Sequence, residues 1–217
     1  VPNKTFDHTK IKELRPLTLI PFDAHLMINE PVKHVHDYID AGSDIITVHA
    51  EVCDESSFGE ICDMLNSNQV GIGLAINPDT ELPQWCYKFV ELLDQVIIMS
   101  VVPGKSGQKF IESTHEKTRR IAKDLREHKF EGYIEADGGV NLENIGACFE
   151  DGARAFVGGS AIIGQNDVRM IIKEFRNQVL ESRRRLLIKK AHDLGGTELV
   201  NSWIDLHVVG EKKDKLV

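Results

Sequence analysis

Six short runs of β-branched and other apolar residues alternate along this chain with stretches of helical periodicity. The runs are Leu17–Ile20 continuing through Asp23 to Leu26, Asp44–His49, Val70–Ile76, Gln95–Val101, Tyr133–Asp137 and Arg154–Gly159. Their central residues, 20, 45, 71, 96, 133 and 155, lie 25, 26, 25, 37 and 22 residues apart, which suits one strand and one helix per repeat. Strict alternation of strands and helices predicts a parallel sheet with right-handed crossovers.

Two of the intervening stretches have clear helix signals. Asn29-Glu30-Pro31 is typical of a helix start, because proline fits the first turn, where its missing N–H is not needed. Ala41-Gly42 is typical of the end of that helix. A later surface helix with one buried stripe is predicted by apolar residues that recur at helical spacing, namely Val168, Ile171, Ile172, Phe175 and Val179.

A doubly wound sheet and a barrel both fit this alternation, and the polar residues favour the barrel. His25, His49, Asn77 and Asp137 all fall at the carboxyl ends of predicted strands, which converge on one mouth in a barrel. We therefore predict a TIM (β/α)8 barrel that lacks about the first two strands, because only six units can be counted. Residues 1–185 are predicted to form the incomplete barrel body, and residues 186–217 a C-terminal extension of unknown role.

The composition is typical of a folded protein, and the net charge argues against some classes of binding partner. Hydrophobic residues make up 41% of the chain, charged residues 28%, and the net charge is −8. An acidic surface disfavours nucleic acid and anionic membranes as partners. No apolar run approaches the length of a membrane span, and no signal peptide is recognisable. The four cysteines, which form no CxxC pair, are expected to be reduced thiols, and the protein is expected to be cytoplasmic.

The strongest candidate for chemistry is Asp137, which ends a predicted strand and is followed by Gly138-Gly139. The two glycines allow the backbone to turn and to approach a ligand. Because Asn141 is the better candidate for capping the next helix, Asp137 stays available for another role. A single histidine in an apolar run, such as His25, is usually a buried structural residue. Together with Asp137, however, His25 is a candidate ligand of a divalent metal ion, which could polarise a substrate carbonyl.

Two glycine-containing segments are candidates for binding a phosphate group. Gly159-Ser160 follows the last predicted strand, at a position where such barrels commonly bind phosphate through backbone N–H groups. The loop Gly104-Lys105-Ser106-Gly107 follows an earlier strand, and its Lys105 side chain would offer a positive charge to a bound phosphate group. His49 and Glu51 form a further pair at a strand end, with a weaker claim to function.

Several of these motifs occur together in one known family. They are Asp23-Ala24-His25-Leu26-Met27-Ile28, Thr47-Val48-His49-Ala50-Glu51, Ala75-Ile76-Asn77-Pro78, Met99 to Phe110, Asp137-Gly138-Gly139-Val140-Asn141 and Gly159-Ser160-Ala161-Ile162. In this order and at this spacing the chain resembles ribulose-phosphate 3-epimerase, a TIM-barrel enzyme family of the pentose phosphate and Calvin pathways. The resemblance spans about residues 1–176.

The resemblance implies an activity and a set of roles. The family interconverts D-ribulose 5-phosphate and D-xylulose 5-phosphate through a cis-enediolate, with two aspartates on opposite faces of C3 and a divalent metal (Zn, Fe, Mn or Co). Asp137 would be one of the two aspartates and a metal ligand, and His25 would be a metal ligand that also contacts substrate. Met27 would line the pocket. Phosphate would bind Gly138, Gly139, Gly159 and Ser160 under the loop of Gly104, Lys105, Ser106 and Gly107. A phosphosugar substrate and a homo-oligomeric assembly are expected.

The sequence also departs from the family pattern. The other catalytic aspartate and another metal-binding histidine belong to a His-x-Asp segment that precedes a Val-Pro-Asn stretch, and this sequence starts at Val1-Pro2-Asn3. We therefore expect the 217-residue chain as written to be inactive and poorly stable, because an open barrel exposes strand edges. An allulose-6-phosphate 3-epimerase, a related phosphosugar enzyme or a degenerate phosphate-binding homologue are the alternatives.

Overall fold

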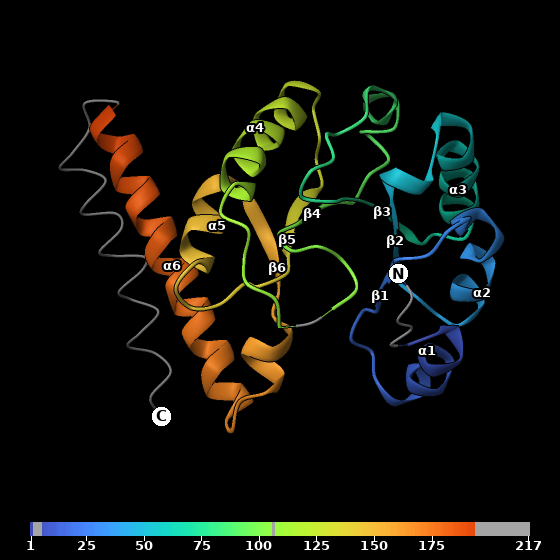
Figure 1. The fold of residues 1–217 in the computed structure, drawn as a ribbon, viewed down its shortest axis with the longest axis horizontal. Coiled ribbons are helices and arrows are strands. Elements are labelled where there is room, and N and C mark those ends of the chain that lie inside the picture. Colours follow the sequence, from blue (N-terminus) through green and yellow to red (C-terminus); the bar gives the residue numbers. More distant parts are fainter. Residues whose placement is uncertain (2–5, 106, 194–217) are drawn as a thin grey trace.

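The computed structural model describes residue 1, residues 6–105 and residues 107–193, and these form an α/β fold around one parallel sheet (Figure 1). The six strands pair in chain order, each parallel to the next. They are β1 (Asp23–Leu26), β2 (Ile45–His49), β3 (Gly71–Ile76), β4 (Gln95–Met99), β5 (Tyr133–Asp137) and β6 (Ala153–Val157). The predicted parallel sheet is thus confirmed, with all six strands present.

Helices connect the strands and lie around the outside of the sheet (Figure 1). The α-helices are α1 (His8–Leu14), α2 (Val35–Asp40), α3 (Glu55–Ser67), α4 (Thr114–Glu127), α5 (Ile145–Asp151) and α6 (Val168–Asp193). Short turns of 3₁₀ or π type are η1 (Arg15–Leu17), η2 (Pro31–Lys33), η3 (Ala50–Val52), η4 (Gln84–Lys88) and η5 (Gly159–Ile163). None of the helices in the described part of the chain is long and apolar enough to cross a membrane.

Each face of the sheet has its own apolar cluster, because successive side chains of a strand point to opposite faces. The larger cluster joins strand residues such as Ile46 and Val48 to helix residues such as Phe58 and Ile61. The smaller cluster comprises Ala75, Ile97, Met99 and Val101, with Met27 packed against it. The smaller cluster therefore marks the inner face of the curved sheet.

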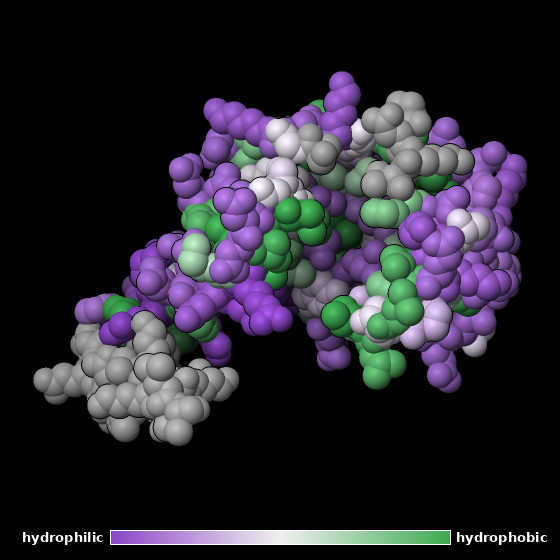
Figure 2. Space-filling model, turned by 90° about the horizontal axis from the view of Figure 1, so that it is seen from below, coloured by the Kyte–Doolittle hydropathy of each residue, from purple (hydrophilic) through white to green (hydrophobic). Residues whose placement is uncertain are grey.

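Within the described part of the chain the sheet has two free edges, since β1 and β6 each pair with only one strand. Apolar side chains are exposed next to both edges: Leu17, Leu19 and Ile20 precede β1, while Ile163 and Met170 follow β6. Figure 2 shows apolar surface on both sides of the hollow between the two halves of the molecule. The described residues thus form a half-barrel.

Some predicted boundaries were wrong. Leu17–Ile20 is not part of a strand, and Leu19 is 99% exposed. Pro16 and Pro21 flank this segment and lack the N–H groups that a strand ladder requires. The last strand is Ala153–Val157, so Gly158 and Gly159 lie beyond it.

The two helices anticipated from their end signals also differ from prediction in detail. The first is divided into η2 and α2, with His34 between them. The second, α6, extends through Asp193 and includes Arg183-Arg184-Arg185. It therefore runs across the predicted boundary at residue 185, and residues 194–217 of the predicted extension lie outside the described part. The division at residue 185 stays a prediction.

Candidate active site

The carboxyl ends of β1, β2 and β5 bring three functional side chains together. His25 lies on β1, His49 ends β2 and Asp137 ends β5. The Nδ1 atom of His25 lies 3.2 Å from Oδ2 of Asp137, and each of these two side chains is 16% exposed. The Nε2 atoms of His25 and His49 are 2.9 Å apart. His25 and Asp137, 112 positions apart in sequence, thus form one cluster on the inner face.

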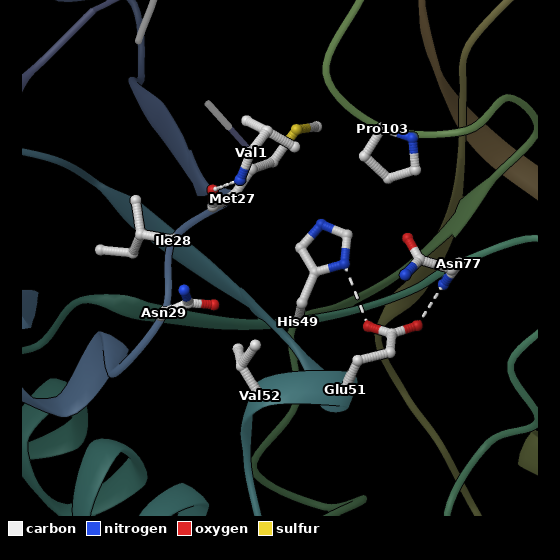
Figure 3. Close-up of a pocket in the computed structure, with 9 residues that line it drawn as sticks. All are labelled: Val1, Met27, Ile28, Asn29, His49, Glu51, Val52, Asn77 and Pro103. Atoms are coloured by element: carbon white, nitrogen blue, oxygen red, sulfur yellow. Dashed lines mark hydrogen bonds and ion pairs between the residues drawn. The ribbon is translucent and has the colours of Figure 1, made fainter. Parts of the chain in front are cut away.

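His49 is held on its other side by Glu51, as Figure 3 shows. Nδ1 of His49 is 3.1 Å from Oε2 of Glu51, and the backbone N–H of Asn77 donates to Oε1 of Glu51 at 2.6 Å. Burial acts to raise the pKa of Glu51, but hydrogen bonds from His49, the Asn77 N–H and Thr80 outweigh it and lower this pKa to about 2. Glu51 is therefore a carboxylate across the neutral pH range.

The loop that supplies the Asn77 N–H is anchored by a buried cation. Lys117 on α4 is 6% exposed, and its ammonium group donates to the carbonyl oxygens of Asn77, Pro78 and Thr80. Desolvation lowers the pKa of this ammonium group, while nearby carboxylates including Glu81 and Glu51 oppose the shift. Nothing in the amphipathic pattern of α4 distinguishes Lys117 from a solvated lysine, so sequence reasoning missed it.

The turn after β5 uses both of its glycines for packing. Gly138 and Gly139 have φ values of +112° and +64°. A Cβ at position 138 would lie 2.3 Å from a methyl group of Val101, and one at position 139 would lie 2.6 Å from the backbone nitrogen of Phe110. Ser100, which the sequence analysis also missed, donates its hydroxyl to the carbonyl oxygens of Asp137 and Gly138 at 3.0 and 2.6 Å.

Asn141 was predicted to cap the helix after β5, but the residue at the N-cap of α5 is Asn144, and its side chain makes no capping hydrogen bond. The Oδ1 atom of Asn141 accepts the backbone N–H groups of Glu143 and Asn144 in the turn before the helix. The side chain of Asp137 takes no part in this turn and faces His25 instead.

The predicted phosphate-binding segments differ in their surroundings. Gly159 and Ser160 are exposed at the start of η5, and a Cβ at position 159 would meet nothing within 4 Å. In the loop after β4, Gln108 donates to the carbonyl oxygens of Val102 and Lys105. Ser106 lies outside the described residues. The backbone at Gly159 is thus open to a ligand, and its phosphate-binding role stays a prediction.

A layer of polar side chains lies deeper on the inner face, and the sequence analysis missed it. Nε2 of Gln95 donates to Oδ2 of Asp23 at 2.7 Å and to Oγ1 of Thr47 at 2.6 Å. Burial, followed by the charges of Asp23 and Asp137, raises the pKa of Glu135 to about 8. Asp23 and Glu135 precede His25 and Asp137 by two positions, so strand alternation was the signal that could have found them.

The donor atoms at the cluster suit part of a metal site. Imidazole nitrogen and carboxylate oxygen are ligands of Zn²⁺, Fe²⁺, Mn²⁺ and Co²⁺. His25 and Asp137 offer one atom of each kind at close range. Among the described residues, however, no group of three or more His, Cys, Asp or Glu side chains is arranged to hold a metal ion. The pair therefore fits a metal with two ligands and leaves its other coordination positions open.

A small pocket of about 120 Å³ adjoins His49, lined by residues that include Met27, His49, Glu51, Asn77 and Pro103. Figure 3 shows the imidazole of His49 at its centre, between Met27 and Glu51. The N-terminal ammonium group of Val1 donates to the carbonyl oxygen of Met27 at 2.8 Å. Met27 thus lines a cavity beside the candidate site.

The fold and the position of the cluster define an α/β barrel protein of the TIM type, with its site at the carboxyl ends of the strands. Structures of similar fold include 3-hexulose-6-phosphate synthase, with a TM-score of 0.60 and 18% identity over 79% of this chain and 80% of the other. A 3-keto-L-gulonate-6-phosphate decarboxylase from Vibrio cholerae matches with a TM-score of 0.60 and 16% identity over 80% of this chain and 79% of the other.

Sequence comparison identifies the family within this class. The model of the "Ribulose-phosphate 3 epimerase family" matches residues 1–163, and the chain belongs to this family. It is 38% identical to ribulose-phosphate 3-epimerase of Bacillus subtilis over 81% of this chain and 80% of that protein. It is 40% identical to the chloroplastic ribulose-5-phosphate-3-epimerase of Arabidopsis thaliana over 80% of this chain, and the match spans 61% of that relative's length.

Proposed function

We propose that the protein interconverts D-ribulose 5-phosphate and D-xylulose 5-phosphate by proton transfer at C3. The observation that carries this proposal is the 3.2 Å approach of Asp137 to His25 at the strand ends of a chain that belongs to this family. The other structural features support it: the glycine turn after β5, the open backbone at Gly159 and the pocket beside Met27.

The proposed reaction removes a proton from the carbon next to the substrate carbonyl. Oδ2 of Asp137 faces His25, so Oδ1 is the oxygen that we assign to proton exchange at C3. A divalent metal held by His25 and Asp137 would polarise the carbonyl and stabilise the negative charge of the enediolate. Inversion at C3 requires a second proton carrier on the opposite face of the sugar, and we assign only one of the two to the described residues.

The phosphate group is proposed to bind the backbone N–H groups of Gly159 and Ser160. Exposed N–H groups at a turn favour an anion without requiring a cationic side chain. Because a Cβ at position 159 would project into open space, a ligand can approach this backbone closely. The loop after β4, with Lys105, is proposed to cover the phosphate.

Deuterium exchange tests the proposal without requiring complete epimerisation. The 217-residue chain is incubated with D-ribulose 5-phosphate and Mn²⁺ in D₂O, and deuterium at C3 is measured by mass spectrometry. Because a positioned general base contributes about 10²–10⁴-fold, we expect exchange to be at least tenfold faster than with Asp137→Asn. Asp63→Asn, a change at an exposed position of α3, is the matched control. Equal exchange by the wild type and Asp137→Asn would contradict the proposal.

A further inference from the structure

The side-chain amide of Asn77 lines the pocket beside His49 and has no hydrogen bond to any described residue. Figure 3 shows this amide group pointing from the turn after β3 toward His49. Its Oδ1 atom is buried and lacks a hydrogen-bond partner in the described part of the chain. Buried polar atoms are almost always hydrogen-bonded, so an unpartnered amide in a pocket wall indicates a site for a polar ligand.

The backbone of Asn77, in contrast to its amide group, is held from both sides by charged residues. Its N–H donates to Oε1 of Glu51 at 2.6 Å, and its carbonyl oxygen accepts from the ammonium group of Lys117. The same carbonyl oxygen accepts the N–H of Thr80 at 3.1 Å, which closes a four-residue turn. Pro78 occupies the second position of this turn, where its fixed φ is favourable. The backbone therefore fixes where the side chain of Asn77 starts, although its amide group is not held.

The amide of Asn77 can offer either a donor or an acceptor to a ligand. The NH₂ group of an asparagine donates two hydrogen bonds, and its oxygen accepts two. Rotation about the last side-chain bond exchanges these two groups, and no hydrogen bond among the described residues opposes that rotation at Asn77. A hydroxyl group, which both donates and accepts, is therefore a suitable partner.

The pocket lies on the side of the candidate site that is remote from the proposed phosphate position. Its described lining residues come from the ends of β1 to β4, for example Met27, His49 and Pro103, and none belongs to β5, to β6 or to the turns after them. The phosphate is proposed to bind after β6, and C3 is proposed to lie at Asp137 on β5. A five-carbon chain that is bound at these two points directs its other end, C1, toward the pocket.

We propose that Asn77 is a specificity-determining residue whose side-chain amide forms a hydrogen bond with the C1 hydroxyl group of the ketose phosphate. This inference rests on the function proposed above, because that function sets the orientation of the sugar. The pocket of about 120 Å³ has room for a hydroxymethyl group, since a water molecule takes about 30 Å³ of the liquid. The site then favours 2-ketose phosphates with a C1 hydroxyl group over their 1-deoxy analogues, because a methyl group leaves the amide without a partner.

The test compares D-xylulose 5-phosphate with 1-deoxy-D-xylulose 5-phosphate, two sugar phosphates that differ only in the C1 hydroxyl group. The dissociation constant of each for the 217-residue chain is measured by ³¹P NMR titration. No metal is added, because the proposed proton exchange at C3 requires one. We expect the wild type to bind the hydroxylated sugar about tenfold more tightly, which is the usual effect of losing one hydrogen bond at a buried polar group.

Variants of Asn77 assign this preference to its amide group. Asn77→Ala should weaken the binding of D-xylulose 5-phosphate about tenfold and leave the binding of the 1-deoxy analogue within about twofold of the wild type. A purely structural role would weaken the binding of both sugars equally. Asn77→Leu replaces the amide with apolar atoms of similar volume and should reverse the preference. Asn66→Ala, at an exposed position of α3, is the matched control and should keep the wild-type preference.

The outcomes separate this inference from the proposed function. Equal affinities of the wild type for the two sugar phosphates would overturn the inference, and this measurement needs no variant to fold. A preference for the hydroxylated sugar that persists in Asn77→Ala or Asn77→Leu would also overturn it. Both results leave the proposed function in place, whereas a wild type that binds neither sugar phosphate would contradict the proposed function and the inference together.

Discussion

The inner strands and the edge strands of this sheet differ in how they are protected. Every residue of β4 is buried, and β2 and β3 are buried at all positions after the first. In contrast, β1 begins with an exposed residue and β6 ends with one, and each has an edge that no other described strand pairs with. His25 belongs to the edge strand β1 and Asp137 to the inner strand β5, so the candidate site joins an edge strand to an inner strand.

This difference between inner and edge strands indicates that one set of residues stabilises the fold and another set forms the candidate site. The inner strands have buried apolar residues on both faces, which pack into the two apolar clusters. The residues of the candidate site lie at or next to the carboxyl ends of the strands, where the loops are free of the packing constraints of the core. Substitutions in the two regions should therefore separate effects on stability from effects on the site.

The largest effect is expected from truncation in an inner strand. Ile98→Ala on β4 removes a side chain that is 1% exposed and should lower the free energy of unfolding by about 2–5 kcal/mol. Val157→Ala on β6, where the side chain is 39% exposed, should cost less than about 1 kcal/mol. Urea denaturation followed by circular dichroism measures both, and equal losses would erase the distinction between inner and edge strands.

A smaller effect is expected from the buried cation on α4. Lys117→Met keeps most of the apolar side chain but leaves three carbonyl groups without their donor, which should cost about 1–3 kcal/mol. Lys123→Met, on the exposed face of the same helix, should change stability by less than about 0.5 kcal/mol. If the two variants were equally stable, Lys117 would not hold the loop after β3.

Two glycines at neighbouring strand ends offer a matched pair. Gly138→Ala places a Cβ against Val101 at a φ of +112°, and we expect a loss of about 1–3 kcal/mol. Gly159→Ala meets open space, and we expect less than about 0.5 kcal/mol. A Gly159→Ala variant as unstable as Gly138→Ala would show that the turn after β6 is packed rather than open to a ligand.

The sequence predicted the strands well where a strand is packed on both faces, because such a strand is a continuous run of apolar residues. Tyr133–Asp137 was predicted with both ends correct, and the strands from β2 to β4 with small errors. Leu17–Ile20 was misread because hydrophobicity alone does not show whether a partner strand is present or whether flanking prolines forbid pairing. Edge strands give a weaker signal for the same reason, and the limits of β6 were displaced.

The candidate site was only partly readable. His25 and Asp137 were identified because each lies at or next to the carboxyl end of a strand. The link through His49 and Glu51 depends on side-chain directions that no spacing reveals, although the pair itself was noticed. Asp23, Glu135 and Lys117 are charged residues on buried faces, and a sequence does not show which face a charge occupies. Their roles emerged only from the arrangement of the strands and of α4.

The smallest effect concerns pH and sharpens the role of Glu51. Hydrogen bonds lower its folded-state pKa to about 2, below the ordinary value of 4.5. This contribution to stability is complete above about pH 4.5 and is lost as the pH falls through about 2. We expect the stability difference between the wild type and Glu51→Gln to shrink across this interval, by at most about tenfold in the unfolding constant per pH unit. A constant difference, measured by urea denaturation at several pH values, would contradict the assigned hydrogen bonds.

Our central proposal is that His25 and Asp137 bind the same metal ion. The broadening of NMR resonances by Mn²⁺ tests this proposal most directly, because paramagnetic broadening detects even weak binding. We predict that resonances of His25, His49 and Asp137 broaden first and that Asp137→Asn abolishes the effect. His115 and Asp151, a histidine–carboxylate pair between α4 and α5, provide the internal control and should stay sharp. Broadening centred on that control pair, or broadening at His25 that persists in Asp137→Asn, would contradict the claim.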